Sequence, residues 1–309
     1  MLPWCLLAQR KAEFAVLEDS IIHIHQQMLS EPIMENRYQM NEQLLYLFEE
    51  VLGMKNSFHY KFDSLKTISV LTSPDKNVRL FTWYVLDDRN NCECFGFLQA
   101  YSEQQKRYLV FPLTDRSKKI SNPSSQRLTH NSWFGAMYYK LLQTEYGGKT
   151  YYTLLGWSGG NMFSQYKVIE VLSLSNKGTP TFGAPLFKGY NKTKPMRIIF
   201  EYVRKGAKLQ LDYSREYYSK RSEKKDKKTN KYTYDTIPAD MIIFNRLIPL
   251  DESLAKIPQY YVPESSLNDA FMETDGRWVF KPGVEGRNKD NKELVPREHK
   301  NREYYKPVE

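Results

Sequence analysis

The segment from Ala270 to Phe280 reads AFMETDGRWVF and sets an Asp-Gly pair between two short runs of alternating apolar residues. Asp-Gly is a strong signal for a two-residue hairpin turn, because both residues tolerate the positive φ angles that such a turn requires. The register that follows places Phe271 opposite Phe280 and Glu273 opposite Trp278. Aromatic cross-strand neighbours of this kind stabilise a sheet, so we predict two antiparallel strands here.

The same period of two recurs over most of the chain. Strand-like runs occur at 67–72, 78–86, 92–101, 107–113, 136–145, 149–157, 167–174, 181–187, 196–204, 207–213, 241–248, 268–273 and 277–281. Tight turn signals separate many of them, and strands joined by tight turns are antiparallel, because parallel neighbours need long crossovers. The absence of strand–helix–strand alternation excludes a dinucleotide-binding sheet. We predict a mainly β protein, an antiparallel meander folded as a sandwich or an incomplete propeller-like array.

A second hairpin is predicted around Lys205-Gly206, between the runs 196–204 and 207–213. A two-residue loop there pairs Val203 with Lys208, Glu201 with Gln210 and Ile199 with Asp212. The opposite face then carries Ile198, Phe200, Tyr202, Leu209, Leu211 and Tyr213. One apolar and one polar face are typical of a sheet with one side on the core. In this register Glu201 and Asp212 are diagonal neighbours on the polar face.

The N-terminal part of the chain has a helical period instead. Apolar residues recur at helical spacing over 11–30 and over about 39–53, and Pro32 and Gly53 are stop signals. We predict a helical hairpin, residues 10–56, that packs its apolar stripe on an antiparallel β domain, residues 57–285. His23 and His25 lie about 200° apart on such a helix, so they cannot share a metal ion.

The first residues, MLPWCLLAQRK, contain a short apolar run that ends at Ala8-Gln9. A secretory signal has a basic start, an apolar core and a small residue at its cleavage site, and only part of this pattern is present. We interpret residues 1–9 as the remnant of an export signal; the alternative is an ordinary apolar N-terminus that packs on the first helix. Cys5 lacks the small residue usual before a lipidated Cys, so no lipid anchor is predicted.

The cysteines and the hydropathy pattern set further bounds. Cys92 and Cys94 stand two residues apart on a predicted strand and share one face, where a disulfide would strain the geometry. Two thiols without His partners are too few for a zinc site. Buried free thiols are therefore expected, and no metal or cofactor is predicted. No run approaches the roughly 18 apolar residues of a membrane helix, so no transmembrane segment is predicted.

Several stretches of the chain carry a resemblance. They are Ser57-Phe58, Tyr60, Phe62 to Leu65, Ser73 to Lys76 with Arg79, Phe81 and Trp83, Leu154 to Trp157, Phe182 to Lys188, Arg197 to Tyr202 and Asp275 to Phe280. Over residues 55–285 the chain resembles a family of uncharacterised exported proteins of Bacteroidota. The resemblance implies export and a mainly β fold. Because that family has no established activity, the resemblance implies no catalytic residue.

Charge is concentrated in two segments. The run KRSEKKDKK begins at Lys220 and lies in a predicted basic loop, residues 219–232, and a charged tail covers 286–309. Such a block could bind nucleic acid, other phosphate-rich polymers or anionic lipid headgroups. Its interleaved acids and its composition are those of a solvated loop, and an exported protein rarely meets nucleic acid. We predict a solvated insertion and no nucleic-acid partner.

Two patterns suggest catalysis. Residues 156–160, GWSGG, match the nucleophile elbow G-x-S-x-G, but no helix follows and the only downstream His is His299 in the tail. A serine without a base is a poor nucleophile, so a glycine-rich turn is favoured over a nucleophilic Ser158. Glu201 and Asp212 could act as the paired carboxylates of a glycosidase, although Lys208 and Gln210 share their predicted face, as on an ordinary solvated sheet.

The aromatic strands suggest binding. Trp83, Trp133, Trp157 and Trp278 are candidates for an exposed ligand-binding surface, although aromatics at strand spacing also suit a core. We predict a non-catalytic exported protein of the envelope or cell surface, in the periplasm or outside, that binds a protein partner or a glycan. The alternative is an exported hydrolase, either a serine hydrolase or a glycosidase. The oligomeric state is left open.

Overall fold

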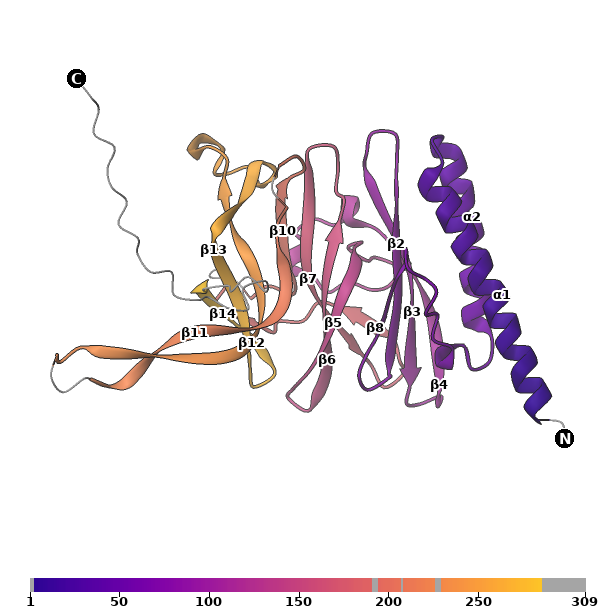
Figure 1. Ribbon diagram of the computed structural model, residues 1–309, viewed down its shortest axis with the longest axis horizontal. Helices are drawn as coiled ribbons and strands as arrows, with labels where there is room; N and C mark the ends of the chain where they lie inside the picture. The colour runs from indigo at the N-terminus through magenta and orange to yellow at the C-terminus, as the bar shows by residue number, and fades with distance from the viewer. Residues whose placement is uncertain (1–2, 191–193, 207, 226–228, 285–309) are drawn as a thin grey trace, which may run out of the picture.

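The computed structural model describes residues 3–190, 194–206, 208–225 and 229–284. Two long helices are followed by three antiparallel sheets, which stack one after another along the long axis of the molecule (Figure 1). The prediction of a mainly β antiparallel protein with an N-terminal helical hairpin is therefore confirmed.

The helical hairpin consists of α1 (Pro3–Ser30) and α2 (Met34–Gly53). Its inner face buries Phe14, Ile21 and Met28, which recur every seven residues and so lie along one side of α1. On α2, Phe48 stacks on Trp83 of the first sheet with ring centroids 4.9 Å apart. The helix α1 continues through Ala8 and Gln9, where the apolar run that we interpret as the remnant of an export signal ends.

The first sheet has the order β1-β2-β3-β4 and is a simple meander. Its strands are β1 (Ser69–Thr72), β2 (Val78–Leu86), β3 (Cys92–Ser102) and β4 (Arg107–Thr114). The second sheet has the order β10-β7-β6-β5, with β8 paired to β7. Its strands are β5 (Met137–Tyr146), β6 (Lys149–Ser158), β7 (Ser164–Leu174), β8 (Pro180–Phe182) and β10 (Ile198–Val203).

The third sheet has the order β11-β12-β13-β14-β9, in which only the short β14–β9 pair is parallel among the described strands. Its strands are β9 (Phe187–Lys188), β11 (Leu211–Lys225), β12 (Tyr232–Pro249), β13 (Tyr261–Thr274) and β14 (Arg277–Val284). Short 3₁₀ turns lie between the strands: η1 (Ser57–His59), η2 (Ser117–Lys119), η3 (Pro123–Ser125), η4 (Glu252–Leu254) and η5 (Pro258–Tyr260).

Three apolar cores separate these layers. The first lies between the helical hairpin and the first sheet, the second between the first and second sheets, and the third between the second and third sheets. Strand β2 shows why a strand can serve two cores: Phe81 and Trp83 belong to the helix-facing core, whereas Val78 and Leu80 belong to the next one. Successive side chains point to opposite faces of a sheet, so the inner sheets are apolar on both sides.

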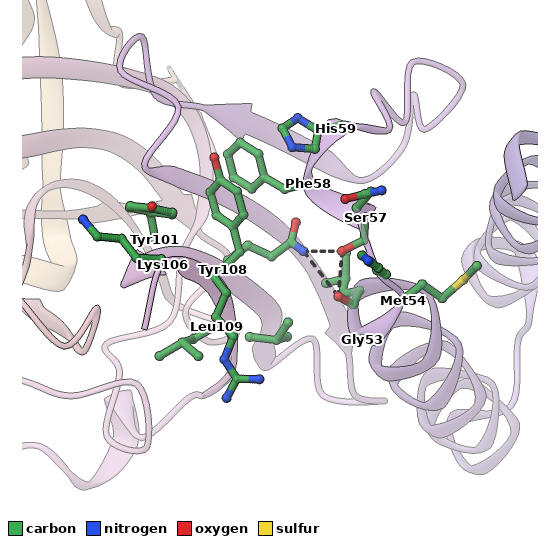
Figure 2. Close-up of a pocket in the computed structure, with 15 residues that line it drawn as sticks. Gly53, Met54, Ser57, Phe58, His59, Tyr101, Lys106, Tyr108 and Leu109 are labelled. Atoms are coloured by element: carbon green, nitrogen blue, oxygen red, sulfur yellow. Dashed lines mark hydrogen bonds between the residues drawn. The ribbon is translucent and has the colours of Figure 1, made fainter. Parts of the chain in front are cut away.

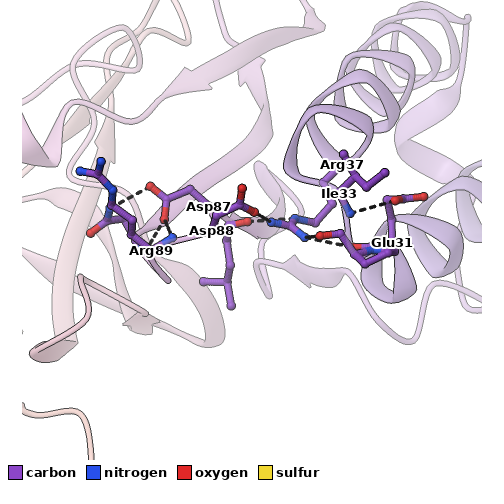
Figure 3. A network of polar contacts seen from close by, with 9 residues as sticks. Glu31, Ile33, Arg37, Asp87, Asp88 and Arg89 are labelled. Atoms are coloured by element: carbon purple, nitrogen blue, oxygen red, sulfur yellow. Dashed lines mark hydrogen bonds and ion pairs between the residues drawn. The ribbon is translucent and has the colours of Figure 1, made fainter.

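One joint between the helices and the first sheet is polar (Figure 3). The guanidinium of Arg37 donates to the carbonyl oxygens of Glu31, Pro32 and Leu86 at 2.9–3.0 Å and pairs with the Asp88 carboxylate at 2.8 Å. Arg37 therefore ties the turn between the helices to the end of β2.

The two predicted hairpins had different outcomes. The Asp275-Gly276 hairpin is confirmed, with Phe271 opposite Phe280 and Glu273 opposite Trp278. The Lys205-Gly206 hairpin is wrong, because β10 pairs with β7 and β11 pairs with β12. The chain leaves the second sheet after β10 and enters the third at β11. The predicted apolar face does form one core, since the two sheets pack face to face: Ile198, Phe200, Tyr202, Leu209 and Leu211 are buried in it, and Tyr213 packs against it.

The predicted basic loop 219–232 is largely strand. Strand β11 continues to Lys225 and β12 begins at Tyr232, with residues 226–228 outside the described part of the chain. The pairing of β12 with β13 begins at Met241, so the earlier part of β12 pairs with β11 alone. The two strands project beyond the stack as a ribbon (Figure 1). The predicted tail 286–309 lies outside the described residues.

The described helices include none with the length and apolar character needed to cross a membrane.

Candidate functional site

Three of the four tryptophans proposed as a ligand surface are core residues. Trp83, Trp133 and Trp278 are at most 1% exposed. Their indole N–H groups donate to Asn41 Oδ1 (2.7 Å), the Tyr138 hydroxyl (2.9 Å) and Thr153 Oγ1 (2.8 Å), respectively. They belong to three different cores and form no common surface. Their assignment as ligand-binding residues is therefore corrected: these large apolar rings fill the layers between sheets.

Trp157 differs, because it is only partly buried. Its Nε1 donates to Gln165 Oε1 at 3.0 Å, and its ring meets Tyr84 edge-on with centroids 5.2 Å apart. This is a single aromatic pair on the second sheet, and its role in binding stays a prediction.

A cavity of about 840 Å³ opens where α2 ends against the first sheet (Figure 2). It is lined by residues 52–59, from the end of α2 through η1, by Gln99 and Tyr101 on β3, and by residues 106–110 on the β3–β4 turn and β4. We call it the cationic cleft for the charges described below.

A polar network forms the floor of the cationic cleft: Gln99 and Ser57 line it, and Arg79 lies behind them, buried and not itself among the lining residues. Arg79 donates from Nε and Nη2 to Gln99 Oε1 at 3.0 and 2.7 Å, and from Nη2 to the carbonyl of Ser57 at 2.7 Å. Its Nη1 donates to the carbonyl of Tyr60 at 2.5 Å. Gln99 in turn donates from Nε2 to Ser57 Oγ at 2.9 Å. Because Arg79 binds two carbonyls of the segment 57–60, the floor of the cleft is held in one conformation.

Arg79 is a buried charge without a counter-ion. Arg79 is 2% exposed, and no carboxylate of the described residues lies at salt-bridge distance from its guanidinium. Phe58, Phe62 and Phe81 surround the guanidinium, with ring centroids 4.9–5.1 Å from Cζ. Burial lowers the pKa of Arg79 to about 10, so the group stays protonated at neutral pH. Cation–π contacts and oxygen acceptors stabilise the charge without cancelling it.

The rim of the cleft adds further positive charge. Lys55, Lys106 and Arg107 line it and are exposed, and none of the described lining residues is Asp or Glu. Lys106 forms an ion pair with Glu103 at 2.8 Å, but both side chains are well exposed. Solvent and salt screen an exposed pair strongly, so it leaves Lys106 available to an anion.

Aromatic side chains form one wall. Phe58 stacks on Tyr108 with ring centroids 3.8 Å apart and planes at 7°, and Tyr101 meets Tyr108 edge-on at 5.2 Å (Figure 2). The Tyr108 hydroxyl donates to the carbonyl of Lys76 at 3.0 Å, which fixes the ring. The cleft therefore combines a fixed aromatic wall with a cationic rim and floor.

A second cavity, of about 390 Å³, contains the residues that suggested a hydrolase. Ser158 and Glu201 both line it, together with Cys92. Ser158 ends β6, and the chain turns directly into β7, so the helix of a nucleophile elbow is missing. No histidine lines this cavity, and His299 lies outside the described residues. Glu201 Oε1 accepts from Ser164 Oγ at 2.6 Å and from the Tyr166 hydroxyl at 3.3 Å. Among the described residues that line this cavity, Ser158 therefore has no histidine to act as its base.

The prediction of Glu201 and Asp212 as diagonal neighbours is wrong. It depended on pairing β10 with β11, and these strands belong to different sheets. The sequence did not predict that Ser158 and Glu201 line one cavity. Strand β7 lies between β6 and β10, and Tyr166 of β7 stands opposite Ser158 of β6 on one side and Glu201 of β10 on the other. The proximity of the two residues therefore depends on the pairing of β10 with β7.

The two thiols on β3 are free and buried, as predicted, with Sγ atoms 4.0 Å apart. The Cys94 thiol donates to Cys92, which lowers the pKa of Cys92, and the backbone N–H of Gly159 lowers it further. The same hydrogen bond, with full burial, raises the pKa of Cys94. Among the described residues no group of three potential metal ligands occurs.

The two helical histidines are separated as predicted: His23 is exposed, whereas His25 is buried with Nδ1 2.7 Å from Thr67 Oγ1.

Comparison with protein-family models, curated proteins and solved structures found no match to this chain. The chemistry of the cavities is therefore the basis for the functional proposal.

Proposed function

We propose that the protein is a non-catalytic binding protein that takes an anionic glycan into the cationic cleft. The observation that carries this proposal is the buried guanidinium of Arg79, which lies behind Gln99 and Ser57 of a cleft whose described lining includes basic residues and no carboxylate. In a partly buried site, charge attracts an anion more strongly than it does on an open surface. A bound carboxylate or sulfate group would supply the missing negative charge.

The aromatic wall supports the choice of a glycan. Tyr101 and Tyr108 are partly exposed and present ring surface beside the cations. The apolar C–H face of a sugar ring can bury area against such rings, at about 25 cal/mol per Å², while Lys106 and Arg107 bind the charged substituent. The cavity volume falls within the range of about 300–1,000 Å³ that is usual for small-ligand sites.

The cellular location is part of the proposal. Export to the periplasm or cell surface is supported by the apolar run that ends at Ala8-Gln9 and by the resemblance described above. An acidic glycan is a ligand that an exported protein meets in the envelope or outside the cell.

The test is a binding titration with acidic and matching neutral oligosaccharides, compared across charge-matched variants. Lys55→Glu with Arg107→Glu reverses two cations of the cleft, and we expect a loss of affinity of about tenfold or more for acidic sugars. The control carries Arg89→Glu with Lys177→Glu, two exposed residues that do not line the cleft. Equal loss in both variants, or equal binding of neutral sugars by the wild type, would contradict the proposal.

The hydrolase alternative has one observation in its favour, namely that Ser158, Glu201 and Cys92 line one cavity. A fluorophosphonate probe tests it directly. Labelling that disappears in Ser158→Ala would favour the hydrolase, and absence of labelling agrees with a binding protein.

A further inference from the structure

Two segments of the chain carry opposite charge. Residues 3–53, which make up the helical hairpin, contain eight Asp or Glu and three Lys or Arg, so their formal charge is −5. The sequence from residue 215 to residue 240, which includes the described strands of the β11–β12 ribbon, contains eight Lys or Arg and five Asp or Glu, so its formal charge is +3. The hairpin and the ribbon lie at opposite ends of the long axis (Figure 1). The two ends of the molecule therefore carry formal charges of opposite sign.

The outer face of the hairpin is an unpaired acidic surface. Its exposed carboxylates are Glu13, Asp19, Glu35, Glu42, Glu49 and Glu50. None of them takes part in the ion pairs formed among the described residues. Two apolar side chains, Tyr46 (68% exposed) and Val16 (64%), project from the same helices. We call this surface the acidic face.

The ribbon is suited to reach a neighbouring molecule. Its strands pair only with each other over residues 215–225 and 232–240, and eleven strand residues span about 35 Å. Arg215, Lys225 and Lys231 are exposed along it. Tyr217 and Tyr232 are exposed on the same strands and offer ring surface for apolar contact.

We propose that the ribbon of one copy of this chain binds the acidic face of the helical hairpin of the next copy. Both surfaces belong to every molecule, and the formal charges of the ribbon and the hairpin, +3 and −5, are opposite. In this contact the tyrosines of the ribbon pack against the exposed Tyr46 and Val16 of the acidic face. A nucleic acid or an anionic membrane could bind the ribbon, but neither would use the acidic face.

This contact is heterologous, since two different surfaces meet, so its repetition gives an open chain or a closed ring of copies. Opposite charges also steer the two surfaces together, and the association weakens with ionic strength. The contact uses no residue of the cationic cleft, so the two proposals stand or fall separately.

The experiment uses sedimentation velocity on the full chain and on two charge-reversed variants. The hairpin variant carries Glu13→Lys, Asp19→Lys, Glu42→Lys, Glu49→Lys and Glu50→Lys, which changes the charge of the hairpin from −5 to +5. The ribbon variant carries Arg215→Glu, Lys225→Glu and Lys231→Glu, which changes the charge of the ribbon from +3 to −3. All the replaced side chains are exposed, and circular dichroism with thermal melting checks that both variants fold.

We expect the wild type to form concentration-dependent assemblies at about 0.05 M salt and to dissociate at about 0.5 M. Each variant alone should be monomeric, because both of its surfaces then carry the same sign. An equimolar mixture of the two variants should assemble again, because each supplies the charge that the other lacks. A monomeric wild type at low salt, assembly of either variant alone to the wild-type extent, or a mixture that stays monomeric would each overturn the proposal.

Discussion

Gln99 accepts two hydrogen bonds from Arg79 on a single oxygen, Oε1, at 3.0 and 2.7 Å, in a place where the guanidinium meets no carboxylate among the described residues. The neutral amide of Gln99 thus accepts hydrogen bonds from the buried guanidinium without neutralising its positive charge. This pairing makes the floor of the cationic cleft both rigid and positive.

The first prediction separates these two roles. Gln99→Glu keeps the acceptor oxygen and adds the counter-charge, so we expect the melting temperature to hold or rise while affinity for acidic sugars falls about tenfold. Gln99→Leu removes the acceptor and should destabilise the fold by about 3 kcal/mol, because a buried charge loses a partner. Thermal melting and binding titration measure the two effects.

The exposed Gln104→Glu, in the turn between β3 and β4, is the control for net charge. If Gln99→Glu binds acidic sugars as tightly as the wild type, the charge of Arg79 does not contribute to binding.

The sequence predicts which neighbouring strands form a hairpin better than it predicts which strands belong to which of the stacked sheets. The Asp275-Gly276 turn fixes its own register, and that hairpin is correct. The Lys205-Gly206 signal failed because an apolar face shared by two strands is satisfied equally well when the strands pair and when they belong to facing sheets. Turn residues alone cannot distinguish these cases. The ribbon was read as a loop because its strands have no core face to impose an alternating pattern.

Part of the candidate site was also visible in the sequence. Arg79 stands in phase with Phe81 and Trp83, which means that a charge occupies the apolar face of β2. This is an unusual position that signals a buried cation. Its acceptor Gln99 lies on the next strand, and the basic rim comes from two segments that meet only in the fold. The buried tryptophans could not be separated from exposed ones, because both suit a strand of period two.

The second prediction concerns the docking of the helices on the first sheet. Arg37 binds three carbonyls and one carboxylate, and Lys cannot reproduce that fork of donors. Arg37→Lys should lower the free energy of unfolding by about 1–2 kcal/mol. The matched variant Asp88→Asn removes only a partner that is largely exposed, so its effect should stay below about 1 kcal/mol. Denaturant unfolding followed by circular dichroism compares them; equal effects would show that the carbonyl contacts contribute nothing.

The third prediction concerns the thiols on β3. The Cys94 hydrogen bond lowers the pKa of Cys92, and Cys92 lines a cavity, so iodoacetamide should modify Cys92 before Cys94. Replacing the donor in Cys94→Ala should raise the pKa of Cys92 and slow its alkylation at pH 7, because the thiolate is the nucleophile. Peptide-resolved mass spectrometry over a pH series reads both rates. Faster modification of Cys94, or an unchanged rate for Cys92 in the variant, would contradict this account.

The last prediction is a pH dependence of stability that originates in the helical hairpin. His25 is 2% exposed, and burial lowers its pKa from 6.5 to about 4. Between these two values the unfolded chain binds a proton that the folded chain does not, so stability is fully present above about pH 6.5 and falls as the pH drops toward 4. The full effect is about 3 kcal/mol.

Thermal melting of the wild type and of His25→Gln between pH 4 and 7.5 tests this. Gln can keep a hydrogen bond to Thr67 and does not titrate, so the variant should lose less stability on acidification than the wild type. The exposed His23→Gln should follow the wild type, since its histidine is solvated in both states. Parallel pH profiles for the wild type and His25→Gln would show that another group causes the acid sensitivity of the protein.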